Sequence, residues 1–163
     1  MANKASFSAD EWKLLRQAPT MAGLVIVAAS PSGPLGVLQE SMAIGKILAD
    51  AKAQGSGSEL VTALVADLTT PEGRQAVQPT ELRGKSADQI KGYALDLCRK
   101  AAALTDQKAP GESAAFKRWL QTIAQKVSEA AKEGGFLGFG GTQVSEQETT
   151  ALTDLRKSLG IAA

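Results

Sequence analysis

The feature that most constrains this chain is the spacing of its apolar residues, which follows the period of an α-helix. Between residues 60 and 68 the apolar side chains fall on one face of a helix, at Leu60, Val61, Leu64, Val65 and Leu68. Comparable stripes recur along the chain between breaks that contain glycine or proline. They predict an all-α fold, a single-domain bundle of about five to six helices over residues 1–163 with no β-sheet.

Local signals predict where the first helix begins and where it is interrupted. Ser8 and Glu11 form an S-x-x-E capping box, and Phe7 stands where a hydrophobic staple begins. Pro19 has no backbone N–H, so we expect it to kink the helix or divide it. The residues from Gly23 to Ala28 are apolar all round, which favours a buried, central helix.

Similar signals predict the later helices. Ser58 or Gly57 opens one, Pro71 suits the first position of a short one, and Ser86 caps another. After the first helix we expect one over about 35–54, one that begins at 57 or 58 and a short one that begins at 71, followed by a loop over 78–85. A further helix runs from 86 to the break at Pro110-Gly111, the next from that break to Gly134-Gly135, and the last over 145–160. The last helix begins with a second S-x-x-E box, Ser145 and Glu148. Two longer stripes are expected to face inward: Ile90, Tyr93, Ala94, Leu97, Ala101 and Leu104, and Phe116, Trp119, Leu120, Ile123, Val127 and Ala130.

The most apolar stretch allows two alternatives to a buried helix. The β-branched run from Gly23 to Ala28 is short enough for a strand, but no second convincing strand is present to pair with it. No residue between Arg16 and Glu40 is charged, a run of 23 residues that is long enough for a membrane span of about 20 residues. Prolines interrupt this run, so we expect a core helix and no stable membrane insertion, with a membrane-surface hairpin as the alternative.

Missing residue types exclude several kinds of chemistry. The chain has no His, which removes the usual general base and the commonest metal ligand. One Cys excludes an intramolecular disulfide and any multi-cysteine metal site. We therefore expect no metal and no cofactor. The formal net charge of +1 gives no field that would attract nucleic acid, and the first 11 residues lack the apolar run of a signal peptide. The use of a single Cys suits a reducing cytoplasm, so we expect a cytoplasmic protein.

The segment from Gly134 to Gly141 is the most unusual in the chain. It contains five glycines together with Phe136, Leu137 and Phe139. A phosphate-binding loop would end in Lys followed by Ser or Thr, which this segment lacks. We expect the three apolar side chains to dock on the bundle, and the alternative is an exposed apolar lip or lid that binds a partner or ligand.

Three weaker patterns have ordinary explanations. The stretch from Leu24 to Gly36 has only two of the glycines of a dinucleotide-binding turn, so we interpret it as an interhelical turn. Cys98 precedes Arg99 and Lys100, but neighbouring residues on a helix point apart, so a packed thiol is expected. Residues 83–132 hold ten Lys or Arg against five Asp or Glu, which we interpret as a mixed solvated surface.

Two sequence elements together suggest a family. The C-terminal run EGGFLGFGG over 133–141, followed by VSE at 144–146, is one. The other is the N-terminal pattern Glu11-Trp12, Gln17-Ala18-Pro19 and AASPSG over 28–33. Both resemble a family of uncharacterised, Ala-rich helical bacterial proteins of similar length. The resemblance implies a bacterial, cytoplasmic protein and supplies no catalytic residue.

The function expected from these observations is non-enzymatic. No nucleophile–base pair, ligand cluster or phosphate loop is recognisable, so we predict a helical-bundle protein that acts through protein–protein contacts or self-association. The alternative is a carrier of a small apolar ligand in the bundle interior, with the Gly134–Gly141 segment as its lid. An enzyme that uses only Lys and carboxylates is the third hypothesis.

Overall fold

The computed structural model describes residues 2–29, 45–47, 50, 57–76, 80–133 and 146–162, with the side chains of all of these except 74–76, 80 and 131–133. Every regular element in these ranges is a helix, which confirms the all-α prediction for the described part of the chain. The elements are the 3-10 helix η1 (Lys4–Ser6), α1 (Ala9–Ala29), α3 (Glu59–Leu68), α4 (Pro71–Ala76), the 3-10 helix η2 (Thr80–Leu82), α5 (Ala87–Lys108), α6 (Pro110–Glu133) and α7 (Glu146–Ser158).

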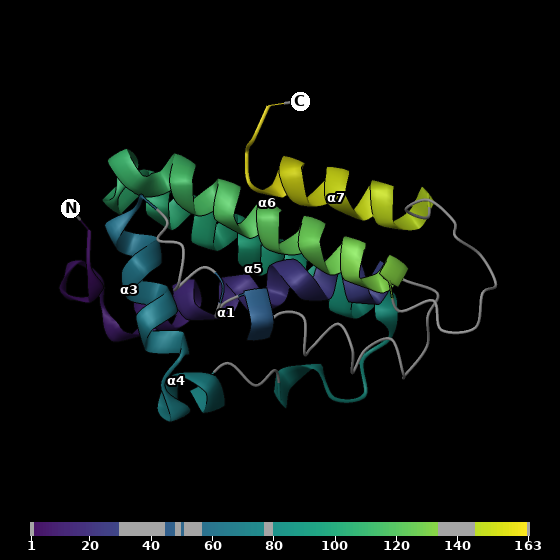
Figure 1. Ribbon diagram of the computed structural model, residues 1–163, viewed down its shortest axis with the longest axis horizontal. Coiled ribbons are helices and arrows are strands. Elements are labelled where there is room, and N and C mark those ends of the chain that lie inside the picture. Colours follow the sequence, from purple (N-terminus) through teal and green to yellow (C-terminus); the bar gives the residue numbers. More distant parts are fainter. Residues whose placement is uncertain are drawn as a thin grey trace.

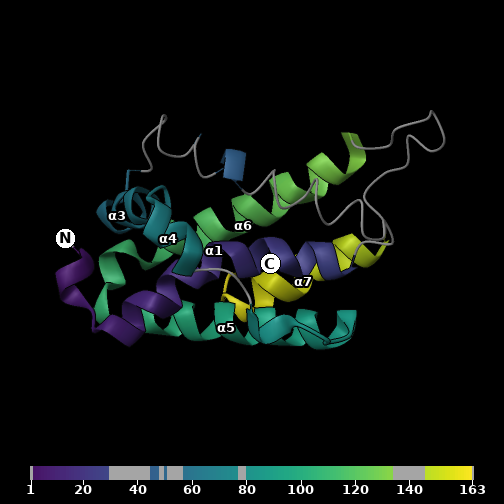
Figure 2. The ribbon, with the colours of Figure 1, turned by 90° about the horizontal axis from the view of Figure 1, so that it is seen from below.

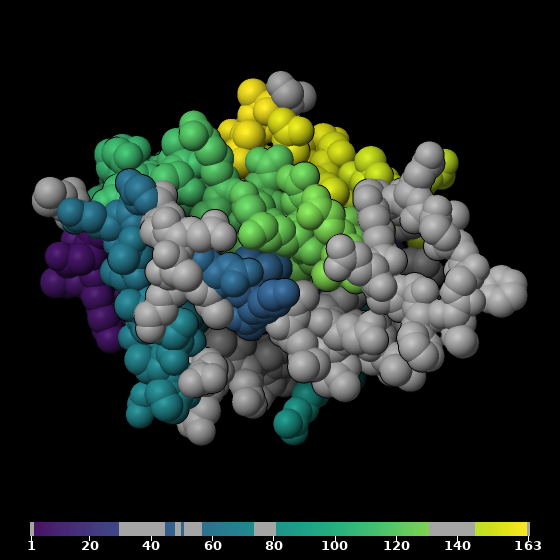
Figure 3. Space-filling model, viewed as in Figure 1, coloured from purple at the N-terminus to yellow at the C-terminus, as the bar shows by residue number. Residues whose placement is uncertain are grey.

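The helix α1 forms the centre of the bundle (Figures 1 and 2). It contacts α3, α5, α6 and α7. The helix α3 crosses the bundle at the end where the chain begins, and α1 ends at the opposite end. In the space-filling view, α3, α6 and the short helical stretch 45–47 share one face of the molecule, and Ile47 of that stretch is buried (Figure 3). Most of the helix expected over 35–54 lies outside the described residues.

The start of α1 follows the sequence prediction. The Ser8 N–H donates to Glu11 Oε2 at 2.7 Å, and the Glu11 N–H donates to Ser8 Oγ at 3.2 Å, which completes the capping box. The ring centroids of Phe7 and Trp12 lie 6.0 Å apart. Trp12 is the fourth residue of α1, the position that packs against the residue before the cap in a hydrophobic staple. These contacts fix the direction in which the chain enters the bundle.

Pro19 does not divide α1, which excludes one of the two outcomes expected from the sequence, a kinked helix or a divided one. The helix continues through Pro19 to Ala29. A proline removes one backbone hydrogen bond and crowds the preceding turn. Here Pro19 is buried, and the turns on both sides of it lie in the core, where tertiary packing outweighs that local penalty. The run from Gly23 to Ala28 is helical, which excludes the strand alternative.

Small side chains bring α1 and α5 close together. Ala18 and Ala22 of α1 and Ala101 of α5 are fully buried, and so is Cys98, whose Sγ lies 3.8 Å from the Ala18 carbonyl oxygen. Short side chains at a contact allow two helix axes to approach closely. Cys98 is therefore a packed core residue, as the sequence predicted.

The predicted inward stripes are buried with a few exceptions. All five apolar residues of the α3 stripe are buried, and Ser58 caps α3 by accepting a bond from the Val61 N–H at 3.2 Å. On α5 the exceptions are Ile90, Tyr93 and Leu104, which are only partly buried. Pro71 begins α4 as expected, and Pro110 begins α6. The expected loop over 78–85 is partly wrong, because residues 80–82 form η2 and Leu82 packs into the core.

The last helix ends as its sequence predicts. Gly160 has a φ of 67°, the left-handed conformation that favours glycine. Its N–H donates to the Lys157 carbonyl at 3.0 Å, and the Ile161 N–H donates to the Arg156 carbonyl at 3.1 Å. These two bonds are those of a Schellman motif. The capping residue Ser145 lies outside the described residues.

Candidate functional site

A cleft opens at the end of the bundle where α1 terminates. It has a volume of about 520 Å³, within the range of small-ligand sites. We call it the α5–α7 cleft. Its lining combines charged, polar and small apolar side chains from three helices: Ala28, Ala29, Asp88, Lys91, Glu146, Gln147 and Thr150.

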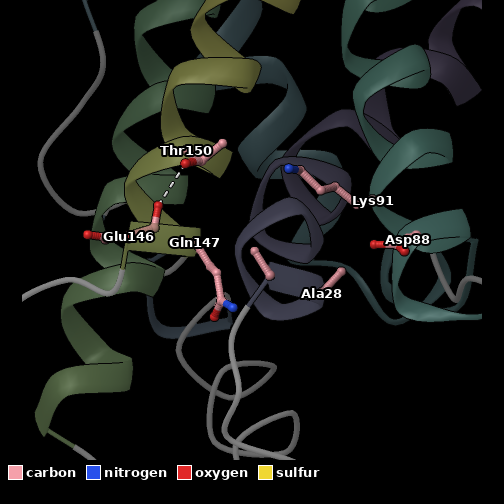
Figure 4. Close-up of a pocket in the computed structure, with 7 residues that line it drawn as sticks. Ala28, Asp88, Lys91, Glu146, Gln147 and Thr150 are labelled. Carbon is pink, nitrogen blue, oxygen red and sulfur yellow. Dashed lines mark hydrogen bonds between the residues drawn. The ribbon is translucent and has the colours of Figure 1, made fainter.

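The two walls of the α5–α7 cleft come from different helices (Figure 4). Asp88 and Lys91 project from the first two turns of α5, whereas Glu146, Gln147 and Thr150 project from the start of α7. The end of α1 lies between the walls and contributes Ala28 and Ala29. The Lys91 side chain points across the cleft toward α7, whereas the Glu146 carboxylate points away from Asp88 and Lys91.

The local sequence explains why carboxylates gather here. Ser86 begins α5 through a capping box with Gln89, which places Asp88 in the first turn. Glu146 occupies the first turn of α7. Negative side chains are favoured in the first turn because they interact with the positive end of the helix dipole. The bundle places these two helix starts on either side of the cleft.

One ion pair joins the two walls. Lys91 Nζ donates to Asp154 Oδ2 of α7 at 2.9 Å, and both side chains are partly buried. The Thr150 hydroxyl donates to the Glu146 carbonyl oxygen at 2.8 Å, which leaves the oxygen lone pairs of Thr150 as acceptors. Among the described residues that line the cleft, Asp88 and Glu146 carry negative charge, and the charge of Lys91 is balanced by Asp154.

Carboxylates at the opposite end of the bundle have a different environment. Glu112, at the start of α6, accepts hydrogen bonds from Ser58 Oγ at 2.5 Å, the Leu60 N–H at 3.0 Å and the Ala2 N–H at 3.1 Å. Burial alone raises the pKa of Glu112, but these three bonds outweigh it and hold the pKa below its ordinary value. A smaller pocket of about 280 Å³ borders this junction.

Asp67 fastens the other end of α3 to α1. Its Oδ2 accepts bonds from Trp12 Nε1 and Arg16 Nη1, each at 3.0 Å, and Lys4 Nζ lies 3.6 Å from its Oδ1. Burial raises the pKa of Asp67, and the bonds from Trp12 and Arg16 reverse that effect, so that the pKa is lowered overall. Asp67 and Glu112 are thus structural anchors for the two ends of α3.

The lone thiol is not activated. Burial raises the pKa of Cys98 to about 12, so the thiol is protonated at neutral pH. Of the two neighbouring cations, Lys100 forms an ion pair with Asp96 at 2.8 Å, and Arg99 pairs with the same carboxylate. Both cationic side chains are largely exposed whereas Cys98 is buried, which agrees with the packed thiol expected from the sequence.

Positive side chains of the basic segment 83–132 are interspersed with carboxylates. Five of its ten lysines and arginines pair with carboxylates of neighbouring turns or helices, in the ion pairs Lys91–Asp154, Arg99–Asp96, Lys100–Asp96, Lys108–Glu11 and Lys117–Asp106. This arrangement agrees with the mixed surface predicted from the sequence.

The residues singled out in the sequence as a lip or lid, Phe136, Leu137 and Phe139, lie outside the described residues. The α5–α7 cleft was not predicted. Its acidic helix starts were visible in the sequence, but each has a local explanation as a favourable first-turn charge. Only the tertiary arrangement shows that residues 88 and 146 line one cleft.

Two searches of the described residues are negative. No group of three or more Cys, Asp or Glu side chains in them is placed to hold a metal ion. None of the helices described is both long enough and apolar enough to cross a membrane. Comparisons of the chain with protein family models, with curated proteins and with solved structures give no match.

Proposed function

We propose that this protein is a non-enzymatic binding protein that contacts another polypeptide through the α5–α7 end of its bundle. The observation that carries the proposal is the contrast between the carboxylates at the two ends. Those near α3 are held by hydrogen bonds from their own chain, whereas the α5–α7 cleft presents charged and polar side chains to solvent. A surface that binds a partner needs groups of the second kind.

The carboxylates with shifted pKa values support a role without catalysis. A carboxyl group that acts as a general acid near neutral pH needs a raised pKa. The fold instead lowers the pKa of its engaged carboxylates, among them Glu11, Asp67, Asp96, Asp106 and Glu112. Burial raises the pKa of the Cys98 thiol, so the thiolate that a nucleophile requires is not formed at neutral pH. These directions disfavour an enzyme that uses Lys and carboxylates alone.

The alternative of an apolar-ligand carrier receives less support. The two pockets described above are lined by charged or polar residues, including Asp88 and Glu146 in one and Glu59 and Glu112 in the other. An apolar ligand would desolvate such groups without replacing their hydrogen bonds. A cytoplasmic location remains part of the proposal, supported by the single, buried thiol.

The test is partner capture with matched variants of the full chain. Wild type, the double variant Asp88→Lys with Glu146→Lys, and the control Asp10→Lys would each be incubated with extract of the source organism and analysed by quantitative mass spectrometry. Asp10 is an exposed first-turn carboxylate of α1 and makes a matched control. We expect one polypeptide, either a partner or a second copy, to be retained by wild type and by the control and lost from the double variant.

Two outcomes would contradict the proposal. Equal retention of every polypeptide by all three proteins would mean that the cleft end makes no specific contact. If native mass spectrometry shows only the monomer with a small molecule bound, the result would contradict the proposal and support the alternative of a ligand carrier. Circular dichroism of each variant confirms that it is folded before its binding is compared.

A further inference from the structure

The helices α1, α5, α6 and α7 form one body in which every helix packs on the other three. All six pairs among these four helices are in contact. Each of them contributes fully buried side chains, for example Ile26, Cys98, Ile123 and Leu155. Helices in proteins are stabilised mainly by burial of an apolar face against neighbours. In this body each helix has three such neighbours besides α3.

The helix α3 is added at one end of this body. It crosses the bundle near the start of the chain and packs on α6 and α1, and α4 follows it (Figures 1 and 2). Its inner side is the stripe of five buried apolar residues described above. An isolated helix shorter than about 12 residues is marginal in water, and α3 has 10 residues. Its order therefore depends on its docking.

The docked helix has a polar anchor at each end. Near its last turn, Asp67 accepts hydrogen bonds from Trp12 and Arg16 of α1, each at 3.0 Å. At its start, the Leu60 N–H donates to Glu112 of α6 at 3.0 Å. Both carboxylates are only partly buried. Water can therefore replace the partner groups when these contacts open, which makes the anchors reversible.

The segment that precedes α1 reaches both anchors. The Ala2 N–H donates to Glu112 Oε1 at 3.1 Å, and Lys4 Nζ lies 3.6 Å from Asp67 Oδ1. Residues 2–4 thus connect the carboxylate at the start of α3 with the carboxylate near its end. This connection couples the two anchors, so that both ends of α3 are released together.

We infer that α3 undocks from the bundle as one unit, controlled by the Asp67 and Glu112 anchors, while α1, α5, α6 and α7 stay folded. Opening uncovers the apolar stripe of α3 and the Trp12 side chain, which is 3% exposed when α3 is docked. Proteins open in contiguous cooperative units at a lower free energy than global unfolding requires. This opening lies outside the proposed function and does not depend on it.

Native-state hydrogen exchange of the full chain measures the opening. The 15N-labelled protein is transferred to D2O, and the loss of each amide signal is followed by nuclear magnetic resonance. We expect the hydrogen-bonded amides of residues 62–68 to have protection factors at least about tenfold lower than amides in the middle of α1 and α5. Low concentrations of urea should change the α3 values little, because undocking exposes less surface than global unfolding does.

The side chain of Trp12 provides a test from within α1. Its indole N–H belongs to α1 but donates to Asp67 of α3, so its exchange requires this bond to open. We expect its protection factor to match that of the α3 amides. An indole N–H as strongly protected as the backbone in the middle of α1 would contradict the release of α3 alone.

Matched variants separate undocking from global unfolding. Asp67→Asn and Glu112→Gln each weaken one anchor and should raise exchange across the whole of α3 about tenfold. Ile26 is fully buried in α1, toward the end of the bundle opposite α3. Ile26→Val should raise exchange of the slowest amides of α1 and α5 about threefold to tenfold and leave that of α3 unchanged. Circular dichroism confirms that each variant is folded.

Three results would overturn the inference. If α3 and the body have equal protection, or if α3 responds to Ile26→Val as the body does, α3 unfolds only with the whole fold. If Asp67→Asn affects only the last turn of α3 and Glu112→Gln only the first, the two ends open separately. If neither anchor variant changes the exchange of α3, the carboxylates do not control its release.

Discussion

The two ends of this bundle use carboxylates in different ways. At the α3 end, Asp67 and Glu112 accept hydrogen bonds from residues far away in the sequence and fasten α3 to α1 and α6. At the α5–α7 end, Asp88 and Glu146 are exposed first-turn residues that line an open cleft. The difference shows that a carboxylate in this fold is structural where backbone and side-chain donors converge on it, and available where only a helix start supports it.

The largest effect is expected at Asp67. The change Asp67→Ala removes the acceptor of the Trp12 indole N–H and of Arg16 and leaves both partly buried donors without a partner. We expect a loss of about 2–3 kcal/mol in the free energy of unfolding. Urea denaturation would measure it, with Asp88→Ala as the matched control. A loss at Asp88 as large as that at Asp67 would remove the distinction between the two ends.

A pair of glycine substitutions tests the packing of the two ends. A Cβ atom at Gly73 of α4 would lie 1.9 Å from the Asp67 carbonyl oxygen, whereas one at Gly92 of α5 would meet nothing within 4 Å. Gly73→Ala should therefore destabilise the protein by about 2 kcal/mol. Gly92→Ala should stabilise it by about 0.5–1 kcal/mol, because alanine favours the helix interior. Thermal denaturation of both variants would show opposite shifts in Tm, and shifts of the same sign would contradict the comparison.

Low pH should destabilise the fold at the α3 end, because the carboxylates of Asp67 and Glu112 become protonated there. The folded state lowers the pKa of Glu112 from 4.5 and of Asp67 from 3.8. A lowered pKa stabilises the fold above the unfolded value, and this stability is lost as the pH falls through the folded value. Glu112→Gln should therefore be about 1–2 kcal/mol less stable than wild type at pH 7, and the difference should shrink below pH 4.5. Urea denaturation at a series of pH values measures this, and a difference that grows in acid would contradict it.

The smallest effect on stability is expected in the cleft itself. Asp88→Asn removes a favourable interaction with the start of α5 but breaks no bond to another helix among those described. We expect a loss of about 0.3–1 kcal/mol, measured by urea denaturation at low salt and reduced at high salt. A loss of several kcal/mol would place Asp88 among the structural anchors.

Sequence reasoning succeeded where the signal is local. The capping box of Ser8 and Glu11, the cap at Ser58, the start of α4 at Pro71 and the end of α7 at Gly160 each depend on a few neighbouring residues, and the structure confirms them. The apolar stripe of α3 was also predicted in full, since its period is set by the helix itself.

Sequence reasoning failed where the tertiary structure decides. Pro19 was expected to kink α1 or divide it, and the division does not occur because burial on both sides keeps the helix continuous. The roles of Asp67 and Glu112 were not predicted, because their partners lie more than 50 residues away along the chain. The α5–α7 cleft was missed for the same reason, since it exists only where the starts of two helices meet the end of a third.

The difference between the two ends can be tested most directly by nuclear magnetic resonance. Two-dimensional 1H–15N spectra of the labelled full chain would be recorded during titration with the polypeptide that partner capture retains. We predict shifts of the backbone signals of Ala28, Ala29, Asp88, Lys91 and residues 146–150, with those of Asp67 and Glu112 unchanged. Shifts centred on the α3 end, or equal shifts at both ends, would contradict the assignment of binding to the α5–α7 cleft.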